Sequence, residues 1–369
     1  MTASIAILPH SCVLAADDQW DVGAEYLGGW IEGAKAPSLV TASSPGTSRA
    51  NAGVVGLPAT EVLLGDEEIG DDFRSGMRLT LSKRLDQSLS FFGSGFFLSE
   101  SQSRSAYGGD DTGSPILSRP FIDGQTGLNN AELVSFPNVL SGAVTVAYES
   151  DVAGAQFGVR RVMPDPSGLI SVSVGYRYLQ LTDSIAIRED LESIDLGGVV
   201  PLGTEFVVRD EFNTKNQFHG ANFGLHIERQ LLGCDIRFSP SVAFGGLRRT
   251  AKVNGDTTVT IPTVTPTITQ GGLLSQPTNI GTYTSTDFTV VPEFRTQIDR
   301  SLFSGCELVF GYSFTLIPNA YRAPSLIDLN VNQSQIGGGS LIGQAVPRFN
   351  DAVDHTWIQT LSWGVVILR

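Results

Sequence analysis

The sequence predicts an all-β protein: a single antiparallel, up-and-down β-barrel of about ten strands that crosses a membrane. Three observations predict it. Apolar and polar residues alternate with a period of two, no apolar run reaches the roughly 18 residues of a membrane helix, and long connections alternate with short ones. In a membrane barrel the apolar face of each strand meets lipid, and the small or charged face lines the lumen.

The alternation is clearest in residues 217–247, where two strands flank a polar break at 229–233. On the first strand Ala221, Phe223 and Leu225 share one face, and small or polar residues occupy the other. A period of two is typical of strands, because successive side chains point to opposite sides of a sheet. This segment therefore predicts a central hairpin.

The same alternation predicts the other elements in order. The ten predicted strands are residues 20–32, 73–85, 88–98, 143–162, 169–187, 204–228, 234–253, 283–298, 306–317 and 354–368. Their apolar faces include Val22 and Tyr26; Met77, Leu79 and Leu81; Phe91 and Phe97; Phe157 and Val159; Val172, Val174 and Tyr176; Phe223 and Leu225; Phe238 and Phe244; Phe288, Val290 and Ile298; Phe310 and Phe314; and Trp357, Leu361 and Trp363.

The connections differ in length in a regular way. Those at 86–87, 164–168, 229–233 and 299–305 are short, and those at 35–72, 99–141, 189–203, 254–282 and 318–351 are long and rich in Gly, Ser, Thr or Asp. Bacterial outer-membrane barrels have an even number of strands, short periplasmic turns and longer extracellular loops. We therefore expect both ends of the barrel domain on the periplasmic side. Strands four to seven exceed the roughly 9 to 11 residues that a tilted strand needs to span a bilayer, so we expect them to project beyond it.

A soluble protein built of stacked sheets is the competing architecture. It would bury Tyr176, Phe223 and Phe310 in a dry centre between two sheets. A sandwich has no reason to place all its long loops at one end, so the asymmetry favours the barrel. The barrel must also be closed, because an open sheet edge cannot lie in lipid.

The charge balance bears on the partners. The formal net charge is −14, and acidic residues gather in the predicted loops. A nucleic-acid-binding face should be basic, so we expect no nucleic-acid partner. The expected partners are the lipid bilayer of the outer membrane and small polar solutes, and the sequence does not indicate an oligomeric state.

Residues of both charge signs fall on the predicted lumen face. These lumen or constriction candidates are Glu25, Arg78, Arg160, Arg177, Glu228, Arg237, Glu293, Arg295 and Glu307. Buried charges are costly unless they are paired. Two interpretations remain open: cross-strand ion pairs that close the lumen, or a charged constriction in a narrow aqueous pore. A wide channel is not expected, because barrels of about eight strands are filled by side chains.

No signature of an enzyme is present. The sequence lacks the GxSxG, HExxH and CxxC patterns, and no EF-hand spacing occurs. His226 lies near Glu228 on the lumen face, but a single such pair is more typical of a structural histidine. We therefore predict no catalytic residue, no metal site, no cofactor and no enzymatic activity. A barrel hydrolase would require carboxylates or histidines that converge at the outer rim.

The N-terminus suggests export. Residues 1–16 are mildly apolar and end in small residues before Asp17 and Asp18, which is typical of the end of an export signal. We expect residues 1–16 to be that signal, in an atypical form, and residues 17–369 to form the outer-membrane barrel domain.

Several long stretches resemble β-barrel porin family seven of bacterial outer-membrane proteins. They are residues 43–86, 132–146, 176–191, 208–225 (VRDEFNTKNQFHGANFGL) and 271–283 (GGLLSQPTNIGTY). The resemblance covers residue 20 to the end and implies an outer-membrane barrel. It implies no substrate and no catalytic residue.

The sequence thus predicts a barrel of the bacterial outer membrane that acts as a narrow porin-like channel or as a structural surface barrel with a mixed-charge lumen. The alternative is a surface adhesin or binding module that uses the long acidic and Thr-rich extracellular loops.

Overall fold

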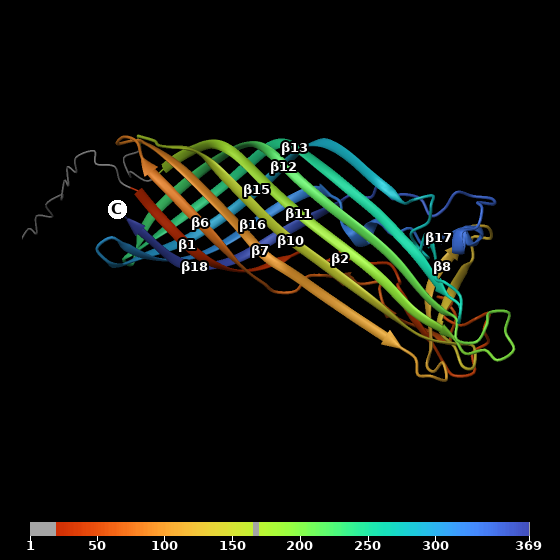
Figure 1. The fold of residues 1–369 in the computed structure, drawn as a ribbon. Coiled ribbons are helices and arrows are strands. Elements are labelled where there is room, and N and C mark those ends of the chain that lie inside the picture. Colours follow the sequence, from red (N-terminus) through yellow and green to blue (C-terminus); the bar gives the residue numbers. More distant parts are fainter. Residues whose placement is uncertain (1–19, 165–169, 369) are drawn as a thin grey trace, which may run out of the picture.

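The computed structural model describes residues 20–164 and 170–368 and contains a closed barrel (Figure 1). Each barrel strand pairs antiparallel with the barrel strands before and after it in the chain, and β1 pairs with β18 to close the cylinder. The barrel strands are β1 (Trp20–Ile31), β6 (Arg74–Arg84), β7 (Leu89–Gly108), β10 (Leu140–Val162), β11 (Ile170–Ser193), β12 (Glu205–Leu231), β13 (Cys234–Thr260), β15 (Gly281–Phe303), β16 (Cys306–Ala320) and β18 (Asp354–Leu368). The predicted fold class is confirmed.

The connections separate into two ends of the barrel. We call the end with the tight turns 85–88, 232–233 and 304–305 the turn end, and the opposite end the loop end. The turn between β12 and β13 has the geometry of a two-residue hairpin turn of type I′, because Leu232 and Gly233 both have positive φ. Trp20 and Leu368 lie at the turn end, as expected.

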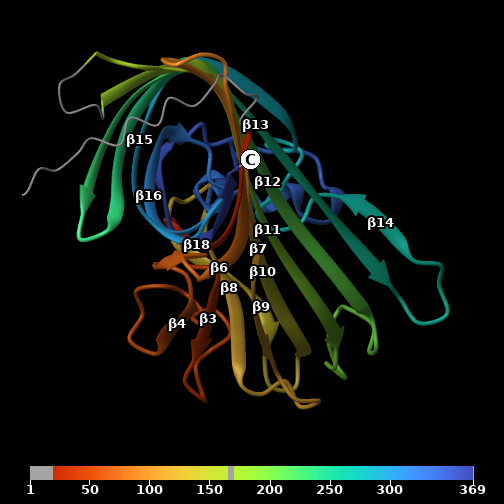
Figure 2. The ribbon, with the colours of Figure 1, turned by 90° about the vertical axis from the view of Figure 1, so that its left-hand side faces the viewer.

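The long strands extend the barrel at the loop end. β12 and β13 have 27 residues each and stay paired along almost their whole length. Figure 2 shows β7, β10, β11, β12 and β13 continuing as a curved wall beyond the ring. We call this wall, formed by residues 102–108, 140–149, 182–193, 205–217, 248–260 and 281–287, the extension. Several predicted boundaries were wrong. The third strand was predicted to end at residue 98, but β7 runs to Gly108. The strands predicted to end at residues 187, 253 and 298 run to Ser193, Thr260 and Phe303.

The long connections contain strands that the sequence did not predict. A five-stranded sheet packs at the loop end and consists of β3 (Val40–Ser43), β4 (Thr60–Leu64), β8 (Ile116–Asp123), β9 (Asn129–Ser135) and β17 (Asn330–Val331). Smaller elements are β2 (Ala34–Lys35), which pairs with β5 (Glu68–Ile69), β14 (Thr267–Gln270), and the 3-10 helices η1 (Ala323–Leu326) and η2 (Gln333–Gly338). The described helices are too short and too polar to cross a membrane.

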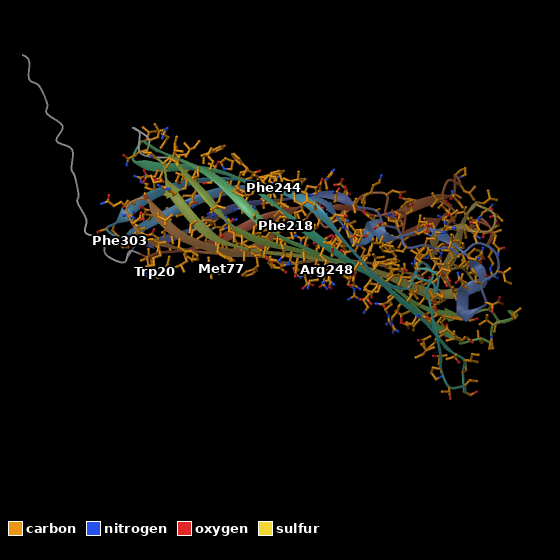
Figure 3. All side chains as sticks on the ribbon, turned by 90° about the horizontal axis from the view of Figure 1, so that it is seen from above. Trp20, Met77, Phe218, Phe244, Arg248 and Phe303 are labelled. Atoms are coloured by element: carbon orange, nitrogen blue, oxygen red, sulfur yellow. The ribbon has the colours of Figure 1, made fainter. Side chains whose placement is uncertain are left out.

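Large apolar side chains cover the outside of the barrel between the turn end and the extension (Figure 3). Tyr176, Phe223 and Phe310 are 37%, 48% and 51% exposed, so they do not meet in a dry centre. We call this outward set the belt: Val22, Tyr26, Met77, Leu79, Leu81, Phe91, Phe97, Phe157, Val159, Val172, Val174, Tyr176, Phe223, Leu225, Phe238, Phe244, Phe288, Val290, Ile298, Phe310, Leu361, Trp363, Val365 and Ile367.

The polarity of the two faces is reversed in the extension. Its outward face carries exposed charged residues, namely Arg104, Arg188, Asp190, Arg209, Glu211, Lys215, Arg248 and Lys252. Its inward face packs Val146, Ile185, Phe212 and Val253 against the loops as an apolar core. The sequence predicted a small or charged inward face, and in the extension the inward face is apolar instead. The extension has the face polarity of a soluble protein, and the belt region that of a membrane barrel.

Candidate functional site: a charged chamber below an apolar septum

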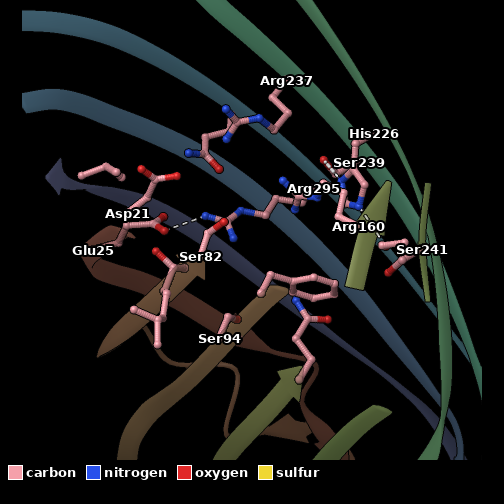
Figure 4. Close-up of a pocket in the computed structure, with 18 of the residues that line it drawn as sticks. Asp21, Glu25, Ser82, Ser94, Arg160, His226, Arg237, Ser239, Ser241 and Arg295 are labelled. Carbon is pink, nitrogen blue, oxygen red and sulfur yellow. Dashed lines mark hydrogen bonds and ion pairs between the residues drawn. The ribbon is translucent and has the colours of Figure 1, made fainter. Parts of the chain in front are cut away.

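A chamber of about 210 Å³ lies inside the barrel at the turn end (Figure 4). The strand ends at Asp21, Ser82, Glu307 and Leu368 line it, so it opens toward that end. Six of the nine predicted lumen residues line this chamber: Glu25, Arg160, Arg237, Glu293, Arg295 and Glu307. Each of them lies at an inward-facing position of its strand, and such positions recur at every second residue.

Ion pairs cross the upper part of the chamber. Glu25 is 2% exposed; it accepts a hydrogen bond of 2.6 Å from Arg295 and lies 4.0 Å from Arg78. Arg177 forms an ion pair with Glu293 across the bore. These pairs join β1, β6 and β11 to β15, and pairing is what makes such buried charges tolerable.

A second set of pairs lies nearer the turn end. Arg237 lies 3.4 Å from Glu228 and 3.3 Å from Asp299. Asp299 also accepts a hydrogen bond of 2.8 Å from Gln297. The structure therefore brings together seven of the nine predicted residues as ion pairs, and in the described part of the chain Arg160 and Glu307 form none.

His226 is held between two serine hydroxyls of the neighbouring strands. Its two ring nitrogens each lie 2.9 Å from a serine hydroxyl, those of Ser173 and Ser239. This histidine therefore spans β11, β12 and β13 through hydroxyl groups. Its closest polar partners are these serines rather than Glu228, which pairs with Arg237.

An apolar layer closes the bore on the loop-end side of the chamber. We call it the septum, and it consists of the inward-facing Leu27, Ile31, Leu98, Val152, Leu179, Leu181, Phe218, Ala243, Leu247, Val291, Ile317, Ala320 and Ile358. Leu27 and Phe218 are 0% exposed, and no septum side chain is more than 2% exposed. A continuous water-filled pore would give such residues contact with solvent, so the septum separates the chamber from the loop end.

A loop arginine clamps the opposite walls above the septum. Arg322 follows β16 and enters the bore, where its Nε pairs with Asp183 of β11. Its guanidinium also donates to the Glu32 carbonyl at 2.8 Å and to the Tyr148 hydroxyl at 2.9 Å. Both charged partners are at most 1% exposed as side chains. The connection between β16 and β18 therefore forms part of the closure.

A second buried charge cluster joins the extension to the five-stranded sheet. Arg119 of β8 pairs with Glu189 of β11 and, at 2.8 Å, with Asp210 of β12. Asp210 also accepts hydrogen bonds from the Leu274 and Ser275 amides at 3.0 and 2.7 Å. The stretch 271–276 is thereby fixed in the buried interior, where every residue of it is buried.

Glu132 of β9 adds a third carboxyl to this cluster. The residue is half-buried, but its Oε2 is completely buried and has no hydrogen-bond partner among the described residues. Burial and the neighbouring Glu189 carboxylate raise the pKa of Glu132 to about 8. One arginine faces three acids, so holding a proton on Glu132 lowers the charge imbalance.

The three histidines of the described ranges lie in different parts of the barrel. His219 lies on the belt side beside Tyr176, His226 lines the chamber, and His355 is exposed at the start of β18. Residues 20–164 and 170–368 contain no group of three or more His, Cys, Asp or Glu side chains that could hold a metal ion.

Sequence reasoning missed several residues of the site. Asp21 and Asp299 share the inward face with Glu25 and Arg295 at every second position, so the same alternation could have found them. Arg322 lies in a loop, where no periodic signal marks it. The predicted export signal at 1–16 lies outside the described residues.

Comparisons with known proteins give one family and several loosely similar structures. No curated protein matches the chain. The chain shows a loose similarity to the solved structures of the outer membrane protease OmpT from Escherichia coli (8% identity, 96% of this chain and 97% of that one, TM-score 0.43), a FadL homologue from Pseudomonas aeruginosa (7%, 95% and 90%, 0.23) and the toluene transporter TodX from Pseudomonas putida (9%, 96% and 89%, 0.20). This loose similarity does not transfer the activity of any of these proteins to this chain.

The family match extends over nearly the whole chain. The family described as "Putative beta barrel porin-7" matches residues 21–368, which run from the first barrel strand to the last. The closed barrel of alternating inward and outward residues agrees with that description. This chain belongs to the beta barrel porin-7 family.

Proposed function

We propose that this protein is a bacterial outer-membrane barrel that spans the bilayer with its belt, holds the extension and five-stranded sheet outside the cell, and does not conduct in the closed form described above. The observation that carries the proposal is the reversal of face polarity between belt and extension. A strand that turns its apolar side outward only along part of its length is suited to lipid only there.

The length of the belt supports the membrane placement. On β13 the outward apolar residues run from Ile236 to Phe244, and on β1 from Val22 to Trp30, which is about nine residues in each case. A tilted strand needs roughly 9 to 11 residues to cross a bilayer. Beyond Phe244 the outward residues of β13 include Arg248 and Lys252, which suit water.

The septum and the clamp support the closed state. Ion pairs, a layer of buried apolar side chains and Arg322 lie one above another in the bore. Opening a path would require separating buried charges or moving the clamped loop, and both changes are costly. We propose a structural or display role for this barrel, with no catalytic function.

Planar-bilayer recording tests the closed state. The folded chain, checked for heat-modifiable mobility, should insert without stable conductance steps. A Leu179→Gly/Phe218→Gly variant, which removes two septum side chains, should give small steps. A matched Phe223→Ala variant on the belt should stay silent. Stable single-channel steps from the wild type would refute the closed form and favour a narrow channel for small polar solutes.

A second candidate function is binding by the loop end. Leu196 and Leu202, in the connection between β11 and β12, are 90% and 52% exposed, and Ile268 of β14 is 70% exposed. Exposed apolar residues that gather on one surface are typical of contact surfaces. A cell-surface ligand that binds the wild type but not a variant with 196–202 shortened to Gly-Ser would favour this adhesin role.

A further inference from the structure

Arg160 is a half-buried cation that forms no ion pair with the residues the structure describes. It lines the chamber from β10, and no carboxylate of the described residues lies within ion-pair distance of it. Its Nε is completely buried without a hydrogen-bond partner, and its guanidinium lies 5.5 Å from the centre of the Phe92 ring. The five N–H donors of this guanidinium therefore lack an acceptor among the described residues, whereas charges inside proteins are normally paired.

The neighbouring charges increase the need for an anion at this place. Arg237 and Arg295 line the same chamber, and each already holds its own carboxylates. The Glu228 carboxylate also acts on Arg160, but it is paired with Arg237. The other groups close by are neutral hydroxyls and amides, including Ser239, Ser241 and Asn222. The guanidinium groups and these hydroxyls make this wall rich in hydrogen-bond donors.

The opposite wall has the opposite character. Asp21 and Glu307 line the chamber at the turn end, and neither forms an ion pair within the part of the chain that the structure describes. Figure 4 shows Asp21 and Arg160 on opposite sides of Arg295. The chamber thus has a cationic inner wall around Arg160 and two carboxylates at its mouth, and Arg237 lies between these two regions.

We propose that the chamber is a binding site for a small zwitterion of the amino-acid class, with its carboxylate on Arg160 and its ammonium group toward Asp21 and Glu307. A carboxylate matches the fork of N–H donors of a guanidinium. A simple anion would satisfy Arg160 but would place no positive charge at the acidic mouth. The volume of about 210 Å³ equals that of roughly seven water molecules, which suits a solute of a few heavy atoms.

The route of entry follows from the septum. The chamber opens at the turn end and is closed above, so a solute enters and leaves by the same opening. With the membrane placement proposed above, this opening faces the periplasm. Binding itself depends only on the chamber and is independent of whether the barrel conducts.

Calorimetric titration of the full chain in micelles tests the site. The probes are glycine, β-alanine and γ-aminobutyrate, with acetate and methylammonium as the two separate halves. At least one amino acid should bind roughly tenfold more tightly than either half, because both walls contribute. The best of the three lengths reports the span between the walls. Equal binding of acetate and the amino acids, or no binding of any probe, would overturn the proposal.

Variants test separately how much Arg160 and the mouth carboxylates contribute to binding. Arg160→Gln should weaken amino-acid binding roughly tenfold or more, and Arg161→Gln, its exposed neighbour on the opposite face, should not. Asp21→Asn/Glu307→Gln should reduce amino-acid binding to the level of acetate and leave acetate itself no weaker. Should Arg160→Gln fail to fold, the mouth variant decides alone, because Asp21 and Glu307 form no ion pair with any residue that the structure describes. Unchanged amino-acid affinity in the mouth variant refutes the zwitterion.

Discussion

Replacement of Arg322 by glutamine should open the loop end of the barrel. The change removes the charge that faces Asp183, whose side chain is 0% exposed, and breaks the hydrogen bonds to the Glu32 carbonyl and the Tyr148 hydroxyl. Breaking a buried pair by removing one partner costs about 3 to 5 kcal/mol, because the other charge stays buried and uncompensated. The free energy of local opening should fall by that amount.

Amide hydrogen exchange measured by mass spectrometry reports this opening. The Tyr321 amide donates to the Asn216 side-chain oxygen at 2.7 Å, so peptides that contain Tyr321 follow the clamp directly. Their protection should fall by about two to three and a half orders of magnitude, since each tenfold change is about 1.36 kcal/mol. Peptides from the belt segment 236–244 should keep their protection.

Two variants complete the test of the clamp. Arg348→Gln, an exposed arginine of the same loop, should leave exchange unchanged. Arg322→Gln/Asp183→Asn removes both charges and should recover at least half of the lost protection, because no unpaired buried charge remains. A loss below about 1 kcal/mol in the single variant would show that the clamp contributes no more than a surface pair, and the reasoning would fail.

Three further predictions concern other parts of the molecule. Glu132→Gln should stabilise the protein near pH 8 and change its stability little near pH 4. The pKa of Glu132 is raised from its ordinary value of 4.5 to about 8 in the folded protein, so the wild type loses stability as the pH rises through this range. Urea unfolding at pH 4 and pH 8 measures the difference. Phe238→Arg, next to the middle of the belt segment 236–244, should cost about 2 to 4 kcal/mol in lipid vesicles. Thr250→Arg, on the outward face of the extension in the same strand, should be nearly neutral, and equal costs would contradict the belt boundary. Gly70→Ala should destabilise the loop end by at least about 1 kcal/mol, because Gly70 has a φ of +85° and an added methyl group would meet the Tyr148 ring; an unchanged melting temperature would show otherwise.

The strands and their faces could be predicted because their signals are local. Alternation in segments such as 217–247 fixes which residues point inward, and all nine predicted lumen residues do so. Which charges pair is a different matter, because it depends on the register between strands. Arg295 meets Glu25, 270 positions away, and no pattern in one strand announces that contact.

The septum and the five-stranded sheet could not be predicted, for physical reasons. Leu27, Leu179 and Phe218 fall on the inward face, and in a chain interpreted as a polar-lined barrel nothing distinguishes them from ordinary variation. The strands in the loops are short, between two residues in β17 and eight in β8, so periodicity is absent. Their pairing depends on contacts such as Arg119 with Glu189 and Asp210, which tertiary structure alone creates.

The order of pairing around the cylinder has a consequence for assembly. Every barrel ladder joins strands that follow one another along the chain, except the seam between β1 and β18, where Asp21 meets Leu368. Hairpins can therefore add one after another at small entropic cost, and only the seam must bring distant parts of the polypeptide together. Until that seam forms, the free edges of β1 and β18 each carry a row of peptide groups without hydrogen-bond partners, and the hydrocarbon of the bilayer offers none. Sealing the cylinder and entering the bilayer should accordingly be one concerted event.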